Sequence, residues 1–256
     1  MTLIMGVVNA TPDSFSGDGR DAASAVRHGF DLVSQGADML DIGAESTRPG
    51  FTPVSPREQI DRLIPVLQGL TAAGVPLSVD TMSAEVAHTA IAAGANMVND
   101  VSGGLGDPAM LELVAASEVD YVCCWWTGWP SHEFSTVISG RPIWRRTADE
   151  LLWRRDACLD AGIEPRRIVL DPGLGFGKSA GDNWQILAHL DTITALGHRV
   201  LVAASRKRFL NQSDVATTAV TAWCVQHGAW AVRVHDVAGN RAAIAVMDRL
   251  AEGAGQ

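Results

Sequence analysis

The chain alternates between short apolar runs and longer segments in which apolar residues recur at helical spacing. The short runs are rich in Val, Ile and Leu, show little polar alternation, and are bounded by Asp, Asn, Gly or Pro. The eight runs are Leu3–Asn9, Asp38–Ala44, Pro76–Thr81, Met97–Val101, Asp120–Trp126, Arg167–Gly173, Arg199–Ser205 and Trp230–Asp236. Such runs are typical of strands that are buried on both faces of a parallel sheet.

The segments between these runs predict helices. They are Ala22–Gln35, Ser55–Ala73, Ser83–Ala93, Asp107–Ala116, Thr147–Ala161, Asp182–Leu196, Val215–Gln226 and Asn240–Ala251. The second segment opens with Ser55-Pro-Arg-Glu58, which predicts a capping box with proline at the first helical position. Glycine follows several segments, as at Gly36 and Gly94, and this is a common left-handed end of a helix.

Strict alternation of eight strands with eight helices predicts an α/β fold, a single-domain (β/α)8 TIM barrel that spans residues 1–256. The length is close to the roughly 250 residues that are typical of this fold. An open doubly wound sheet is the alternative. Since no linker, low-complexity stretch or block of charge divides the chain, one domain is expected.

Composition narrows the class of protein. Apolar residues make up 47% of the chain and charged residues 19%, which excludes a disordered or fibrous protein. The net charge of −9 argues against binding to nucleic acid or to an anionic membrane. The four cysteines lack the spacing of a disulfide scaffold or a zinc site. Neither a signal peptide nor a run near the roughly 20 apolar residues of a membrane helix is evident, so we expect a cytoplasmic protein.

Polar residues end nearly every predicted strand. They are Asn9, Asp41 with Glu45, Asp80, Asn99 with Asp100, Asp171, Ser205 with Lys207, and Arg233 with His235. In a barrel these positions meet at the C-terminal mouth, where active sites of this fold lie. One such residue is often only a helix cap or a turn former. Recurrence around the whole rim predicts a binding site.

The residue types at the rim indicate two kinds of ligand group. The potential cations are Lys207, Arg48, Arg233 and His235. Their convergence on an acidic protein favours a small anion, with phosphate the first candidate. Asp80 and Asp171, together with the amide of Asn99, suit the donor-rich edge of a nitrogen heterocycle. The combined hypothesis is a heterocycle that carries a phosphate or pyrophosphate.

One phosphate-binding motif is excluded. Pro172–Ser179, with the sequence PGLGFGKS, ends like the phosphate loop of P-loop proteins. Pro172 stands at the first position, where that loop requires glycine. The segment therefore does not predict a P-loop.

Seven longer strings, in order along the chain, identify a family. They are Met5–Phe15 (MGVVNATPDSF), Asp41–Gly50 (DIGAESTRPG), Ser78–Thr81 (SVDT), Asn99–Gly104 (NDVSGG), Asp171–Lys178 (DPGLGFGK), Ser205–Lys207 (SRK) and Arg233–Val237 (RVHDV). Through them the chain resembles the dihydropteroate synthases of folate biosynthesis, the targets of sulfonamides, over nearly its full length. The actinobacterial branch is the most similar.

The resemblance implies a transferase. It would join 6-hydroxymethyl-7,8-dihydropterin pyrophosphate to p-aminobenzoate by a dissociative substitution at the pterin methylene. The products would be 7,8-dihydropteroate and pyrophosphate. The family further implies a Mg²⁺ cofactor, small-molecule partners only, and a homodimer.

The resemblance also implies roles for particular residues. The pterin site would comprise Asp80, Asn99, Cys124, Asp171, Lys207 and Arg233. The p-aminobenzoate site would comprise Thr47, Arg48, Pro49, Phe176 and Ser205. Asn9 and His235 would hold the pyrophosphate, and Asn9 would also be the protein ligand of Mg²⁺. The catalytic set would be Asn9, Asp18, Arg48, Lys207, Arg233 and His235.

Three departures from the family pattern keep alternatives open. Asp18 stands one place later than the family's loop carboxylate, Cys124-Trp125 replaces Met-His, and the chain is shortened after Leu210. The alternatives are a catalytically weakened pterin-binding paralogue and a pterin-binding module of methyltransferase type. The Ser-Thr-Arg-Pro-Gly and Ser-Arg-Lys strings favour the synthase, because methyl transfer needs no p-aminobenzoate site.

Overall fold

The structure is a computed structural model that describes residues 1–10, 22–44, 54–125 and 140–254. Within these residues, eight parallel strands close into a barrel in chain order. The strands are β1 Leu3–Asn9, β2 Met39–Gly43, β3 Leu77–Asp80, β4 Met97–Asp100, β5 Asp120–Cys124, β6 Ile168–Asp171, β7 Arg199–Val202 and β8 Ala231–Val234. The sheet closes between β1 and β8, where Met5 pairs with Arg233. The predicted TIM barrel is confirmed, and the open sheet is wrong.

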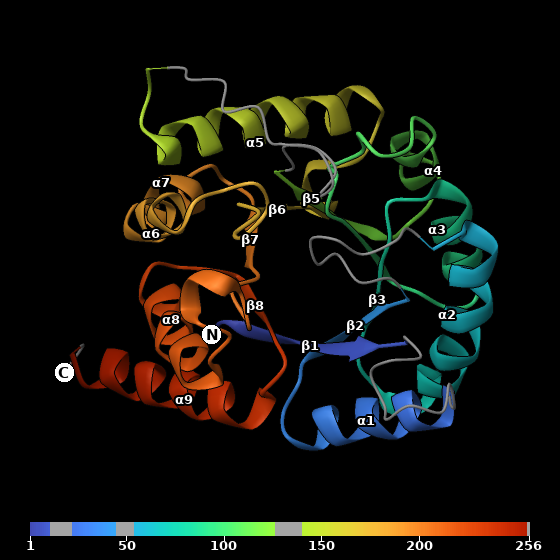
Figure 1. Ribbon diagram of the computed structural model, residues 1–256, viewed down its shortest axis with the longest axis horizontal. Coiled ribbons are helices and arrows are strands. Elements are labelled where there is room, and N and C mark those ends of the chain that lie inside the picture. Colours follow the sequence, from blue (N-terminus) through green and yellow to red (C-terminus); the bar gives the residue numbers. More distant parts are fainter. Residues whose placement is uncertain (11–21, 45–53, 126–139, 255–256) are drawn as a thin grey trace.

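Helices surround the strands as an outer ring (Figure 1). They are α1 Ala22–Ser34, α2 Pro56–Leu70, α3 Ala84–Ala92, α4 Met110–Ala115, α5 Ile143–Asp160, α6 Ala180–Ala188, α7 Leu190–Thr194, α8 Asp214–Gln226 and α9 Val237–Ala254. Three short 3-10 turns, η2 Thr71–Ala73, η3 Pro165–Arg167 and η4 Arg208–Leu210, complete the described elements. None of the helices within the described ranges is both long enough and apolar enough to cross a membrane.

Several predicted helices differ from those observed at their ends, including α4 and α9, and two differences have a visible cause. The segment Asp182–Leu196 forms α6 and α7, which meet at His189 with ψ of 31°. The His189 ring stacks on Trp144 of α5 with ring centroids 4.4 Å apart, so the residue at the break packs against a neighbouring helix. Helix α5 begins four residues before the predicted Thr147, directly after Pro142, whose ring fixes φ and allows a helix to start.

The predicted capping box at Ser55 forms only in part. The Ser55 side chain accepts a hydrogen bond from the Glu58 amide at 3.3 Å, whereas the Glu58 carboxylate pairs with Arg62. The reciprocal box occurs instead at the start of α6. There Ser179 accepts from the Asp182 amide at 3.1 Å, and Asp182 accepts from the Ser179 amide at 2.9 Å.

The core has an outer and an inner part. The outer part packs the strands against the helices. The inner part fills the barrel below its mouth with Met5, Met39, Met97, Val122, Val169, Leu201 and Ala231. Side chains two residues apart on a strand point to the same side. The residues two places further along the strands therefore point into the barrel one layer higher, and there the polar side chains begin.

Candidate active site at the barrel mouth

Four inward-pointing side chains form a connected network above the apolar layer. The Oδ2 atom of Asp41 accepts hydrogen bonds from Arg233 Nε at 2.6 Å and from Asn99 Nδ2 at 2.9 Å. The same guanidinium reaches Asp80 Oδ2 through Nη2 at 2.8 Å. Four strands, β2, β3, β4 and β8, thus contribute one group each. Because the cation is shared by two carboxylates, the network is held together by charge as well as by hydrogen bonds.

Asp41 is a site residue to which the sequence reasoning gave no role. It was noted only as the end of a strand, yet it is fully buried at the centre of this network. Its other oxygen, Oδ1, has no hydrogen-bond partner among the described residues. The available signal was strand parity, since Asp41 is two residues after the inner-core residue Met39.

The carboxyl groups of Asp80 and Asp171 hold their protons more tightly than exposed carboxyls do. Burial raises the pKa of Asp80 to about 7, with Asp41 adding to the rise and Arg233 opposing it. Burial also raises the pKa of Asp171, against the opposing hydrogen bond that its Oδ1 accepts from the Gly173 amide at 2.7 Å. A ligand that brings N–H donors to these groups stabilises their ionised forms. The pocket is therefore suited to a heterocycle rich in donors.

Lys207 follows β7 and approaches the same space. Its Nζ lies 4.0 Å from the centroid of the Phe176 ring. Burial and the nearby Arg233 lower the pKa of Lys207, while Asp171 opposes the change. The resemblance assigns Phe176 to the p-aminobenzoate site. A residue of that site is thus in contact with Lys207 of the pterin site.

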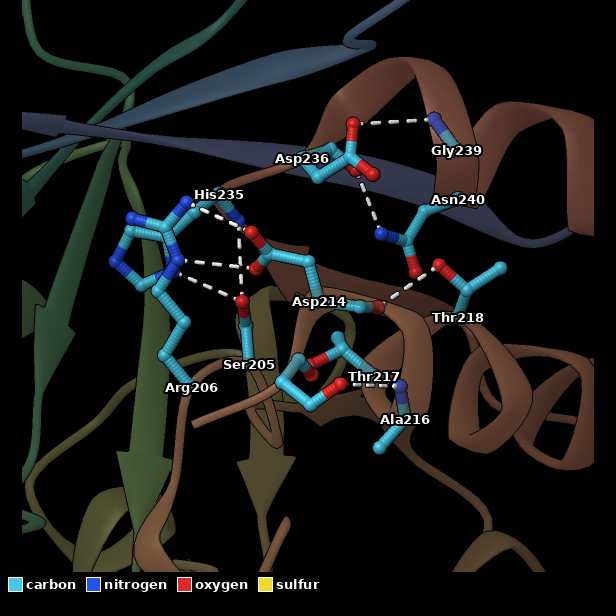
Figure 2. Close-up of polar contacts among 11 residues, drawn as sticks. Ser205, Arg206, Asp214, Ala216, Thr217, Thr218, His235, Asp236, Gly239 and Asn240 are labelled. Carbon is cyan, nitrogen blue, oxygen red and sulfur yellow. Dashed lines mark hydrogen bonds and ion pairs between the residues drawn. The ribbon is translucent and has the colours of Figure 1, made fainter. Parts of the chain in front are cut away.

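Ser205 and His235 are joined at the ends of β7 and β8 (Figure 2). Ser205 Oγ lies 2.8 Å from His235 Nδ1 and also accepts a hydrogen bond from the His235 amide at 3.2 Å. The adjacent Arg206, at a left-handed φ of 55°, donates two hydrogen bonds of 2.9 Å to Asp214 at the start of α8. This ion pair links the segment that follows Ser205 to the start of α8.

Asn9 and Cys124 complete the described part of the predicted site. Asn9 ends β1 opposite Gly43, and its parity with Met5 directs it to the barrel interior. Cys124 is buried at the end of β5, and burial raises the pKa of its thiol well above the ordinary value. The thiol therefore stays protonated and lines the pocket without acting as a nucleophile.

Asn9, the predicted ligand of Mg²⁺, lies within the described residues. No group of three or more His, Cys, Asp or Glu side chains suited to a metal occurs in that part of the chain. Asn9 offers a single amide oxygen. This fits Mg²⁺, which keeps several waters and takes its remaining ligands from substrate phosphates.

Four predicted site residues fall outside the described residues, namely Asp18, Thr47, Arg48 and Pro49. Their roles remain predictions. The structure brings together the other predicted residues at one mouth, and they are Asn9, Asp80, Asn99, Cys124, Asp171, Phe176, Ser205, Lys207, Arg233 and His235.

Comparisons with known proteins agree on one family. Residues 5–235 match the family described as "Pterin binding enzyme". The chain is 40% identical to the dihydropteroate synthase of Mycobacterium leprae, over 91% of this chain and 88% of that protein. It is 37% identical to the dihydropteroate synthase of Bacillus subtilis, over 92% of this chain and 84% of that protein.

A solved structure extends the agreement to three dimensions. Xanthomonas albilineans dihydropteroate synthase with 4-aminobenzoic acid superposes with a TM-score of 0.89 at 41% identity, covering 97% of this chain and 93% of that chain. With the barrel and its polar mouth, these matches show that the chain belongs to the pterin-binding enzyme family and, within it, to the dihydropteroate synthases, which are transferases.

Proposed function

We propose that the barrel mouth condenses 6-hydroxymethyl-7,8-dihydropterin pyrophosphate with p-aminobenzoate, and that the residues described above divide the work. The observation that carries this proposal is the buried network of Asp41, Asp80, Asn99 and Arg233 beside Asp171 and Lys207. It combines acceptors for a donor-rich ring with cations for a phosphate. Related structures support both substrates. One contains 4-aminobenzoic acid, one contains 6-hydroxymethylpterin monophosphate, and one contains 7,8-dihydropteroate.

The carboxylates and the amide bind and orient the pterin. Asp80, Asn99 and Asp171 accept or donate hydrogen bonds at its edge, and Lys207 reaches it from the end of β7. Arg233 covers the ring and extends toward the phosphates, as a planar guanidinium can. Holding the methylene carbon in front of the second substrate supplies much of the rate through positioning.

The bond between the pterin methylene and the pyrophosphate oxygen breaks first, and the electron-rich ring stabilises the cationic carbon. The amine of p-aminobenzoate then forms the new C–N bond and loses a proton to water or to the departing pyrophosphate. Arg233 and His235 would stabilise the negative charge on the leaving group. Mg²⁺, held by Asn9, would neutralise further charge on the pyrophosphate. No nucleophilic side chain is required, consistent with the protonated thiol of Cys124.

Pyrophosphate release tests this function. The purified chain is given the pterin pyrophosphate and Mg²⁺, with or without p-aminobenzoate. We expect release that depends on p-aminobenzoate and is lost on adding EDTA. Asn9→Ala should raise the Mg²⁺ concentration needed for half-maximal rate. Pterin binding by calorimetry without release would instead indicate the weakened paralogue.

A cytoplasmic homodimer is the second part of the proposal. An apolar groove of about 380 Å³ lies between α6, η4 and α8, and its lining includes Leu187, Val220 and two half-exposed tryptophans, Trp184 and Trp223. A second copy would cover these side chains. We expect sedimentation to give twice the 27.1 kDa chain mass. Trp184→Glu should lower that mass, whereas Trp153→Glu on α5, a control that is also about half exposed, should not.

A further inference from the structure

The turn between β6 and α6 packs against the end of β5. Three of its residues, Gly173, Gly175 and Gly177, have left-handed φ values of 65°, 79° and 60°. A Cβ on Gly173 would lie 2.2 Å from the Trp125 carbonyl oxygen, so only glycine fits there. The turn is therefore built around direct backbone contact with Trp125.

Lys178 closes this turn from inside. Its Nζ donates hydrogen bonds to the Gly173 carbonyl at 2.6 Å and to the Phe176 carbonyl at 3.1 Å. The same nitrogen lies 3.9 Å from the centroid of the buried Trp125 ring. The lysine of the P-loop-like string thus binds the carbonyls of its own turn, and an aromatic face stabilises its charge.

The opposite face of the turn contacts the other lysine. Lys178 and Lys207 are the only lysines in the sequence. Phe176 lies against Lys207 Nζ at 4.0 Å, and a Cβ on Gly175 would meet Lys207 Cδ at 2.8 Å. A shift of the turn would therefore move both the Phe176 ring and the Lys207 side chain.

We propose that Lys178, seated on the Trp125 ring, is a positioning residue that fixes the 173–177 turn and so presents Phe176 to p-aminobenzoate. Lys178 does not touch either substrate and acts through the turn. The inference rests on the proposed function, which places p-aminobenzoate against Phe176. Trp125 stands where the family pattern has histidine. The contact of Lys178 with an indole ring is therefore a feature of this chain's own sequence.

The contacts of Lys178 with the turn and with the Trp125 ring are sensitive to pH. Burial lowers the pKa of Lys178 to about 7, with Lys207 adding to the decrease and Asp171 and Asp182 opposing it. The protonated form makes charge-assisted hydrogen bonds and the cation–π contact, and the neutral amine makes weaker ones. These contacts are therefore strongest below pH 7, and they weaken as pH rises through that value.

Lys178→Met tests the inference because methionine has a similar length and no N–H donor. We expect the KM for p-aminobenzoate to rise about tenfold and the KM for the pterin pyrophosphate to rise by less than about threefold, since the turn presents Phe176 directly and only adjoins Lys207. A role in folding alone would not separate the two KM values. Lys178→Arg keeps the charge and the donors, so it should recover part of the loss.

Trp125 variants provide the matched control. Trp125→Phe keeps an aromatic face and should behave nearly as the parent, whereas Trp125→Leu should raise the same KM. The Lys178→Met and Trp125→Leu effects should combine to less than their product, as expected for residues that act as one unit. Near-parent KM values in a folded Lys178→Met protein would overturn the inference.

Carbon-13 labelling of lysine gives a readout that does not need turnover. The ε-carbons of the two lysines should give two resonances, and Lys178→Met assigns one of them by its disappearance. We expect that resonance to titrate near pH 7 and to shift in Trp125→Leu. A Lys178 resonance that is the same in the parent and in Trp125→Leu would also overturn the inference, because the Lys178 ammonium would then not lie on the Trp125 ring. A parent protein that releases no pyrophosphate would overturn the proposed function, which distinguishes the two failures.

Discussion

Replacing Arg233 with methionine is expected to lower kcat/KM for pyrophosphate release by about a thousandfold. The guanidinium is the shared partner of Asp41 and Asp80, at 2.6 and 2.8 Å. Its charge opposes the burial that raises the pKa of Asp80. Without it, Asp80 would stay protonated at neutral pH and the leaving group would lose a counter-charge. Steady-state kinetics at pH 7.5 measures both losses together.

Arg199→Met is the matched control for this prediction. Arg199 begins β7 at the opposite end of the barrel, where it pairs with Asp120 at 2.8 Å and stacks on Trp230. Its replacement removes the same charge and a similar ion pair far from the mouth. We expect kcat/KM within about threefold of the parent, since surface ion pairs contribute little. Equal losses in both variants would show that the Arg233 effect is one of stability.

Arg233→Lys separates charge from geometry. Lysine supplies the charge but cannot bridge two carboxylates with a planar fork. We expect an activity between those of the parent and the methionine variant. If Arg233→Met retained more than a tenth of the parental kcat/KM, the network of Asp41, Asp80 and Arg233 would not be the centre of the site.

The barrel and most of the residues at its mouth could be predicted from the pattern of the strands. Their burial indicates a parallel sheet, and their period of two shows which side chains share one face. A run buried on both faces has few alternatives to a central parallel strand. Once eight such runs were counted, parity placed Arg233 and His235 on one side of the last strand. The position of Ala231 in the inner core confirms that this side faces the barrel interior.

What the sequence could not predict depends on contacts between distant segments. Asp41 looks like any strand-ending carboxylate until β2 is placed beside Arg233, 192 residues away. His189, the residue at the break between α6 and α7, packs against Trp144 of a neighbouring helix. The sequence excludes Lys178 as a P-loop lysine, but it does not predict the contact of Lys178 with the ring of Trp125, the residue after β5. None of these contacts leaves a local pattern.

Asp80→Asn is expected to weaken pterin binding. It should also remove a loss of stability that the parent protein shows as pH rises. The folded pKa of Asp80, about 7, lies above its ordinary value of 3.8, so the folded chain keeps a proton that the unfolded chain releases between these pH values. The parent protein therefore loses stability as pH rises through that window, by at most about 1.4 kcal/mol per pH unit from this group. Asparagine has no such proton and lacks this loss.

The two effects of Asp80→Asn are measured separately. Calorimetry should show about a hundredfold weaker binding of the pterin, because an ionised acceptor becomes a neutral amide. Urea unfolding from pH 4 to 8 should show the variant gaining on the parent up to pH 7 and running parallel above it. The broken contact with Arg233 offsets the curves without changing their slopes. Parallel profiles for Asp80→Asn would mean that Asp80 is ionised across this range. If the variant binds the pterin less tightly but is more stable, then the buried carboxylate of Asp80 favours binding and lowers the stability of the folded chain.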